Sequence, residues 1–150
     1  MNCIRCGKCC TRTRMQLTQD DIRRIEKLGF KKEMFVKYDL NGFAKIKNSQ
    51  GYCIFYNDFE KKCIIYDNRP IGCKLYPIIY DAQKHAVTVD QLCPSAQTVT
   101  RREIKRKQKL LISTVEQLFK EAEERKNIKK QKTIPKNNRG GCQARSKAQD

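Results

Sequence analysis

Apolar side chains at helical spacing mark the first regular element of this chain. They recur at three-residue intervals from Ile22 until Gly29 ends the run. Thr18 and Asp21 match the capping-box pattern that starts many helices, and Leu17 is placed to pack against Ile22 across that cap. The sequence therefore predicts an amphipathic helix that begins just after Thr18 and ends near Gly29.

The middle of the chain changes to short β-type patterns. Residues 51–56 and 62–66 are rich in Cys, Ile, Tyr and Phe, and Asn57–Asp58 between them is typical of a turn. Residues 78–80 and 86–89 are expected to pair as a hairpin. These runs predict several short strands rather than one large sheet.

Two short helices are expected among these strands. One covers residues 31–37, and the other begins near Asn68 and Pro70 because proline is favoured in the first turn of a helix. Pro77 is expected to close the second helix. The predicted fold class is therefore a small α+β or irregular domain.

A second amphipathic pattern covers residues 100–126, where Thr100 and Glu103 form another capping box. One face of this long helix is apolar and consists of Ile104, Leu111, Val115, Leu118 and Ala122. We expect this face to pack on the preceding domain, and a dimer interface is the alternative. We predict a cysteine-cluster domain over residues 1–97, the helix over 98–126 and a disordered basic tail over 127–150.

Composition explains why such a domain needs additional stabilisation. The 150 residues are 39% hydrophobic and 33% charged, they include no Trp, and the formal net charge is +17. A core this small commonly requires metal ions or disulfides, and nine cysteines could supply either. We find no glycine-rich nucleotide loop and no G-x-S-x-G motif that would indicate common enzyme classes.

The expected compartment distinguishes metal sites from disulfides. The first residues contain no apolar signal-peptide core, and no stretch approaches the about 18 apolar residues of a membrane span. We therefore expect a cytoplasmic protein without membrane association, in which reduced thiols bind metals. The Lys-, Glu- and Ile-rich composition is typical of thermophiles, where intracellular disulfides remain an alternative.

Eight cysteines are the predicted metal ligands. Four form the pattern C-x2-C-x2-C-C, in which the short spacing and Gly7 allow neighbouring thiolates to face one metal. The complete predicted set is Cys3, Cys6, Cys9, Cys10, Cys53, Cys63, Cys73 and Cys93. His85 and Cys142 lie outside any ligand spacing and are not expected to bind metal.

Two kinds of metal centre fit these thiolates, which favour soft metals such as zinc, copper(I) or iron in iron–sulfur clusters. Eight thiolates could form two tetrahedral zinc sites. Alternatively, C-x2-C-x2-C resembles the start of a ferredoxin motif whose fourth cysteine precedes proline, as Cys93 precedes Pro94. The cofactor prediction is therefore zinc or iron, including a [4Fe–4S] cluster. The non-metal alternative is that Cys53, Cys63 and Cys73 are small buried hydrophobic residues.

The cysteines and their surroundings resemble the CxxCxxCC cysteine-cluster family, whose members are described as zinc- or iron-chelating. The resemblance covers about residues 1–95. It is carried by the N-terminal cysteine run, LTxxDI over 17–22, GYC over 51–53, CIIYDNRP over 63–70, CKLYP over 73–77 and CP at 93–94. It implies that the eight cysteines are the metal ligands. Lys74 is a mild departure, because relatives often have Arg there.

Some relatives are larger flagellin lysine N-methylases, but we find no S-adenosylmethionine-binding motif here. Around the cysteines, Arg69 and Tyr76 are candidate hydrogen-bond donors to metal-bound thiolates. Arg69 could instead pair with Asp67 or Asp58. The sequence therefore does not decide whether the protein is an enzyme.

Three functional hypotheses follow. The first is a metal-binding protein, and the second is a cluster-dependent redox or methyl-transfer enzyme or enzyme subunit. The third is a metal-stabilised protein that binds nucleic acid weakly and without sequence preference. Residues 101–109 contain six basic residues and one acid, and residues 126–150 contain eight basic residues and one acid, so both segments suit polyanionic partners. The alternative is that these charges form only a solvated helix face and a disordered tail.

Overall fold

The fold is described from a computed structural model over residues 3–4 and 6–133. Its helices are η1 (Lys8–Cys10), α1 (Gln19–Glu26), α2 (Lys32–Phe35), η2 (Tyr66–Asn68), α3 (Ile71–Leu75), η3 (Ala96–Thr98) and α4 (Arg101–Thr133). Its strands are β1 (Val36–Tyr38), β2 (Ala44–Ile46), β3 (Asn48–Ser49), β4 (Tyr52–Cys53), β5 (Tyr56–Asn57), β6 (Lys62–Cys63), β7 (Ile78–Asp81) and β8 (Ala86–Val89). The predicted tail from residue 134 onward, with Cys142, lies outside the described residues.

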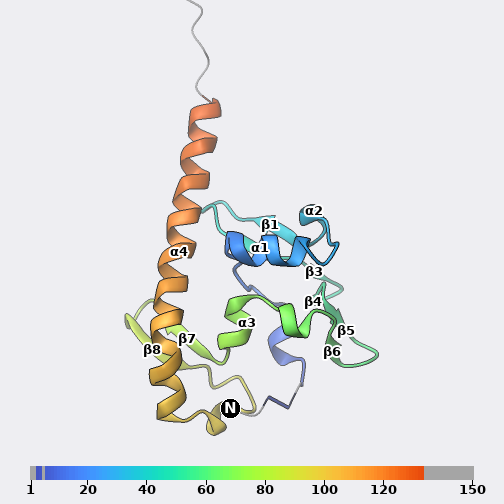
Figure 1. The fold of residues 1–150 in the computed structure, drawn as a ribbon, viewed down its shortest axis with the longest axis vertical. Coiled ribbons are helices and arrows are strands. Elements are labelled where there is room, and N and C mark those ends of the chain that lie inside the picture. Colours follow the sequence, from blue (N-terminus) through green and yellow to red (C-terminus); the bar gives the residue numbers. More distant parts are fainter. Residues whose placement is uncertain (1–2, 5, 134–150) are drawn as a thin grey trace, which may run out of the picture.

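The fold is a small mixed α+β arrangement with a long C-terminal helix, as predicted. Within the described residues, the strands form antiparallel pairs of sequence neighbours: β1–β2, β3–β4, β5–β6 and β7–β8. Figure 1 shows α4 running along one side of the molecule, with the β7–β8 hairpin beside its first half and α1 beside its middle. The last turns of α4 extend beyond the other elements (Figure 1).

Both predicted capping boxes are present. At α1, the Thr18 hydroxyl accepts from the Asp21 backbone N–H at 3.1 Å, and the Asp21 carboxylate accepts from the Thr18 backbone N–H at 3.2 Å. At α4, Thr100 and Glu103 make the same reciprocal pair at 3.2 and 3.3 Å. These caps satisfy backbone donors that the first turn of a helix leaves without partners.

Two hydrophobic clusters form the interior. The larger joins α1 to the short hairpins and consists of Leu17, Ile22, Ile25, Phe35, Val36, Ala44, Ile46, Cys53, Phe55 and Ile65. The smaller joins α3, β7 and α4 through Leu75, Ile78 and Leu111. Ile104 and Val115 pack at the edge of the smaller cluster, so the apolar face of α4 is directed toward its own chain.

Several element boundaries differ from the predictions. The helix expected over 31–37 ends at Phe35, because Val36 starts a strand paired with Ile46. The β-type run over 62–66 remains extended only to Cys63, and the chain then turns into η2. Helix α3 begins at Ile71, and Pro70 occupies the position before it. The hairpin of β7 and β8 is confirmed, with Ile78 opposite Val89.

Helix α4 continues to Thr133, beyond the predicted end at residue 126. The added residues are mostly Lys and Gln, which favour helices, and no proline occurs between Arg101 and Pro135. Within the described part of the chain, no helix has both the length and the apolar character needed to cross a membrane.

Candidate metal centre

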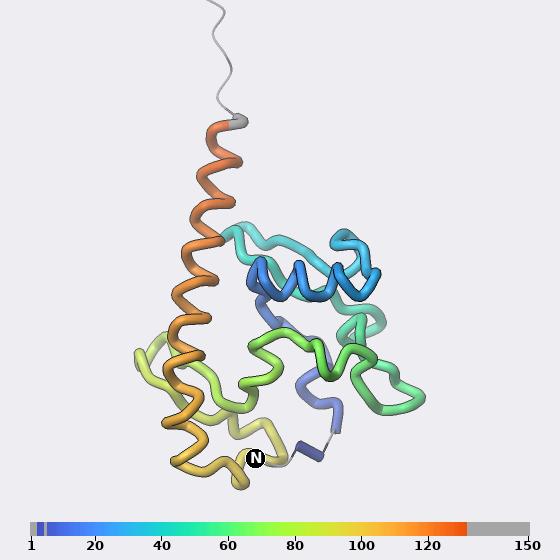
Figure 2. The backbone as a smooth tube through the Cα atoms, viewed as in Figure 1, coloured from blue at the N-terminus to red at the C-terminus, as the bar shows by residue number. Residues whose placement is uncertain are grey.

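A single pocket of about 110 Å³ brings the predicted ligands together. They come from the N-terminal loop, β4, β6, α3 and the turn before η3, and Figure 2 shows the blue loop close to the yellow segment before η3. The cysteines that line the pocket are Cys3, Cys6, Cys9, Cys10, Cys53, Cys63, Cys73 and Cys93. The pocket thus contains every cysteine predicted as a ligand, although their binding of a metal stays a prediction.

The N-terminal loop is shaped by Gly7. Its φ angle is +73°, and a Cβ atom there would lie 2.3 Å from the Tyr56 hydroxyl oxygen, so a larger residue would be strained and would clash. The Cys10 backbone N–H donates to the Gly7 carbonyl at 2.8 Å and closes the turn. The Arg12 N–H then donates to the Gly51 carbonyl at 2.7 Å. These contacts hold the end of the loop beside strand β4.

The short hairpins carry two further thiols. Cys53, at the end of β4, is buried within the larger hydrophobic cluster. Cys63, at the end of β6, pairs with Tyr56 across the next hairpin and is half-buried. Phe55 lies in the turn between β4 and β5 and is almost fully buried. The hydrophobic cluster thus forms one wall of the pocket and fixes the backbone that bears both cysteines.

Helix α3 presents Cys73 from another side. The preceding residue, Gly72, lies against Met15, and a Cβ atom on Gly72 would be only 2.4 Å from the Met15 sulfur. Met15 also lines the pocket. The absence of a side chain at Gly72 therefore lets α3 approach the N-terminal segment closely.

The turn that carries Cys93 is organised by Asp90. One oxygen of its carboxylate accepts from the Tyr76 hydroxyl at 3.0 Å, and the other accepts from the Leu92 N–H at 2.9 Å. The Asp90 carbonyl accepts from the Cys93 N–H at 3.2 Å. The Tyr76 hydroxyl, considered as a donor to a thiolate, therefore donates to Asp90 and stabilises this turn.

The thiols influence one another electrostatically. A hydrogen bond between Cys9 and Cys10 lowers the pKa of Cys9 to about 7 and raises the pKa of Cys10. Burial raises the pKa of Cys53 to about 11, and it also raises the pKa values of Cys63 and Cys73. Repulsion between neighbouring sulfurs adds to these increases. The four thiols whose pKa values are raised hold their protons until a cation compensates the thiolate charges, whereas Cys9 ionises more readily.

Arg69 lines the pocket, and its positive charge favours the thiolate forms of Cys9 and Cys63. Its guanidinium donates to the Tyr66 carbonyl at 2.9 Å and stacks 3.9 Å from the centre of the Tyr66 ring. Its charge opposes the rise in the pKa of Cys63 that burial causes. In the described residues, no ion pair connects Arg69 with Asp67 or Asp58, and Asp58 pairs with Lys61 at 2.7 Å. Among the residues that the structure describes, Arg69 therefore has no carboxylate partner in an ion pair.

The donor set fits a metal centre made of sulfur. Among the described residues that line the pocket, there is no histidine and no carboxylate, which leaves cysteine thiols and the Met15 thioether as the candidate ligands for a soft metal. No three Cys, His, Asp or Glu side chains in the described residues form a closed ligand group, so the thiols surround the pocket without completing a coordination sphere. His85 lies outside the pocket, in the turn before β8.

The sequence patterns missed two residues at the site: Asp90, which supports the turn that carries Cys93, and Met15, which lines the pocket. Asp90 lies three residues before Cys93, a position typical of an aspartate that stabilises a turn, and this spacing could have revealed it. Met15 lies outside every pattern that we recognised. Its contact with Gly72 follows only from the packing of α3.

The comparisons with known proteins agree with this chemistry. A family model described as "Putative zinc- or iron-chelating domain" matches residues 2–94, which is more than half of the chain. The chain belongs to the CxxCxxCC family. The range matched by the CxxCxxCC model contains all eight cysteines of the pocket and ends before α4.

One curated relative of this CxxCxxCC chain is an uncharacterized protein of Methanocaldococcus jannaschii, which is 32% identical over 94 residues. The alignment covers 59% of this chain and 50% of the relative, so the chain spans about half the length of the curated relative it matches. No solved structure matches the chain significantly.

Proposed function

We propose that this protein binds zinc or an iron–sulfur cluster through thiolates of the eight pocket cysteines. The observation that carries this proposal is their convergence on one pocket that, in the described residues, lacks histidine and carboxylate. The description of the family as zinc- or iron-chelating supports metal binding in general. Cysteine thiolates are the ligands of structural zinc sites and of most iron–sulfur clusters.

The eight thiols divide into two groups, which we call the inner and outer thiols. The inner thiols lie close enough to perturb one another's ionisation, and they are Cys9, Cys10, Cys53, Cys63 and Cys73. The outer thiols are Cys3, Cys6 and Cys93, and they line the same pocket. We propose that a first four-thiolate centre takes its ligands mainly from the inner group. The outer thiols would complete this centre or bind a second metal.

Metal analysis of anaerobically purified protein tests this proposal. We expect tightly bound zinc, or iron with an equal amount of inorganic sulfide and a visible absorption band, since the latter two identify a cluster. Cys9→Ser should lower the metal content because it removes an inner thiol, whereas Cys142→Ser is the matched control and should not. A folded wild-type preparation with free thiols and neither metal would refute the proposal.

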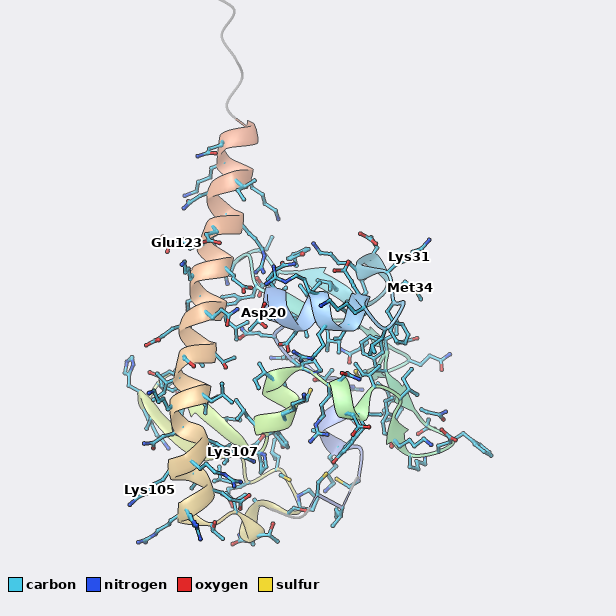
Figure 3. All side chains as sticks on the ribbon, in the orientation of Figure 1. Asp20, Lys31, Met34, Lys105, Lys107 and Glu123 are labelled. Atoms are coloured by element: carbon cyan, nitrogen blue, oxygen red, sulfur yellow. The ribbon has the colours of Figure 1, made fainter. Side chains whose placement is uncertain are left out.

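The surface of α4 favours a second, independent function, which is weak binding to nucleic acid. Four basic residues occupy one stripe of the helix, at positions i, i+3, i+4 and i+7, and each is exposed: Arg102, Lys105, Arg106 and Lys109. Lys105 points away from the domain in Figure 3. Phe119 is the only aromatic residue after position 100, so base stacking contributes little. Binding would therefore rest on phosphate contacts and would carry no base preference.

A titration against RNA and duplex DNA at low and physiological salt tests this second function. We expect binding that weakens steeply with salt and that is reduced in the double variant Lys105→Glu/Lys109→Glu. The variant Lys27→Glu/Lys31→Glu alters two exposed lysines near α1 and changes the net charge equally, so it serves as the control. Equal losses in both variants would show that only overall charge matters, and sequence-selective, salt-insensitive binding would place recognition elsewhere.

A further inference from the structure

Asp21 is a buried carboxylate that connects two elements of the pocket domain. Its side chain is only 1% exposed. One oxygen completes the capping box with the Thr18 backbone N–H. The other accepts from the Arg24 guanidinium and, at 3.0 Å, from the backbone N–H of Ile71. The bond to Ile71 spans 50 residues of sequence and joins α1 to the first residue of α3.

Arg24 strengthens the same junction. Its guanidinium donates to the Arg69 carbonyl at 3.1 Å and to the Asn68 carbonyl at 3.4 Å, immediately before α3. Within this ion pair, Asp21 accepts from a backbone N–H at the start of α3, and Arg24 donates to two backbone carbonyls just before it. A charge-assisted hydrogen bond from a buried carboxylate is stronger than a neutral one, so this junction fixes the start of α3 firmly.

The position of Cys73 depends on this junction. Helix α3 contains only five residues, Ile71–Leu75, and Cys73 lies two residues after the N–H that Asp21 accepts. A helix this short has too few internal hydrogen bonds to hold its own orientation. Contacts from other elements must therefore decide where its cysteine points.

We propose that Asp21 is a positioning residue for metal binding, because it holds α3 in the orientation that presents the Cys73 thiol to the pocket. This inference rests on the proposed metal-binding function and deepens it. The aspartate of the LTxxDI motif in α1 would thus position the thiol of the CKLYP motif in α3. Asp21 itself lies outside the pocket lining and does not act as a ligand.

The test uses the full-length protein and cobalt(II) as the probe, under anaerobic conditions. Thiolate-to-cobalt charge-transfer absorption reports how many thiolates bind, and competition with a chelator reports the affinity. In Asp21→Asn one carboxylate oxygen becomes an NH2 group, so the side chain can no longer accept from all three donors. We expect a loss of about tenfold to a hundredfold in cobalt affinity and weaker charge-transfer absorption, as for Cys73→Ser.

Two control variants separate positioning from general destabilisation. Thr18→Ala breaks the other half of the same capping box, and Asp20→Asn alters the exposed neighbouring carboxylate. Thr18→Ala should lower the melting temperature and leave the cobalt spectrum unchanged. Asp20→Asn should change neither. If Thr18→Ala reduces cobalt affinity as much as Asp21→Asn, the effect is general destabilisation and the inference is wrong.

A double-mutant cycle with Cys73→Ser gives the decisive comparison. If Asp21 acts through Cys73, Asp21→Asn should cost little further cobalt affinity in the Cys73→Ser background. An undiminished loss in that background would overturn the inference. If the wild type binds cobalt normally and Cys73→Ser is impaired, normal binding by Asp21→Asn would overturn this inference. The proposed metal-binding function would still stand. Absence of cobalt binding by the wild type would instead refute the proposed function.

Discussion

The thiol pocket and helix α4 are organised in opposite ways. Helix α4 is one continuous element, Arg101–Thr133, whose backbone groups hydrogen-bond within the helix. The pocket is assembled from a loop, two-residue strands and a five-residue helix, and backbone bonds such as those from Arg12 to Gly51 and from Ile46 to Met15 join its segments. Short elements of this kind have little stability of their own. The comparison shows that α4 is supported locally, whereas the pocket depends on distant contacts and, in our proposal, on metal.

The two regions are nevertheless joined at two levels. Near its beginning, α4 contributes Leu111 to the small hydrophobic cluster with α3 and β7. Further along, the contacts become polar, and the Glu121 carboxylate accepts from the backbone N–H of Gln19 at 2.9 Å. Arg125 donates to the Gly42 carbonyl at 3.1 Å. Helix α4 lies outside the range matched by the family model, yet it forms part of the same folded unit.

Metal removal should separate the two regions most strongly. We expect a strong chelator to abolish hydrogen-exchange protection throughout the pocket, including Cys53 and Cys73, and also in the adjoining helix α1. Protein–metal binding in zinc-finger peptides is worth about 10–16 kcal/mol, and such binding energy is folding energy. The middle of α4 should lose less protection, because its hydrogen bonds are internal. Hydrogen exchange followed by mass spectrometry on matched metal-loaded and chelated samples measures both regions.

The control for this experiment is re-addition of metal, which should restore protection if chelation has not caused aggregation or thiol oxidation. Equal protection of the pocket before and after chelation would contradict our view that metal organises this region. Loss of protection in α4 equal to that in the pocket would show instead that both regions unfold as one cooperative unit.

Sequence patterns predicted the elements that carry long periodic signals. Helices α1 and α4 and the β7–β8 hairpin were found because capping residues and apolar spacing extend over several residues. The β1–β2 hairpin was missed, since three-residue strands such as Val36–Tyr38 are too short to show alternation. Strand pairing ended α2 early for a similar reason: the partner of Val36 is Ile46, which no local pattern reveals.

The candidate site was predictable in its chemistry and unpredictable in its geometry. Thiol spacing and the family resemblance identified the cysteines, and all eight line the pocket. Local patterns could not show that Asp21 bonds to Ile71 or that Tyr76 bonds to Asp90, because hydrogen bonds between separate elements depend on how those elements pack. The grouping of inner and outer thiols likewise follows only from their arrangement in space.

The hydrophobic contact of α4 gives the next largest effect. Leu111 is 7% exposed in the cluster with Leu75 and Ile78, so Leu111→Ala should lower the free energy of unfolding by about 2–5 kcal/mol. Ile112 is 41% exposed, and Ile112→Ala is the matched control, with an expected change below about 1 kcal/mol. Urea denaturation of metal-loaded protein measures both values. Similar losses in the two variants would mean that Leu111 is not packed on α3 and β7.

The polar contact of α4 should have the smallest effect. Both oxygens of the Glu121 carboxylate accept from the Gln19 N–H, at 3.0 and 2.9 Å, so α4 supplies a negative charge to the first turn of α1. The same carboxylate pairs with Arg125 at 2.8 Å. Glu121→Gln keeps the size of the side chain but replaces one acceptor with an NH2 donor. We expect it to lower the free energy of unfolding by about 1–2 kcal/mol.

Glu123 provides the control for that substitution, because it extends from α4 toward solvent on the side away from the domain (Figure 3). Glu123→Gln removes the same charge from the same helix and should change the free energy of unfolding by less than about 0.5 kcal/mol. Urea denaturation of the two metal-loaded variants compares them directly. If both substitutions have the same effect, the contact between Glu121 and α1 contributes only through the net charge of the helix. If only Glu121→Gln is destabilising, α4 stabilises the pocket domain through the first turn of α1, the helix that also contains Asp21.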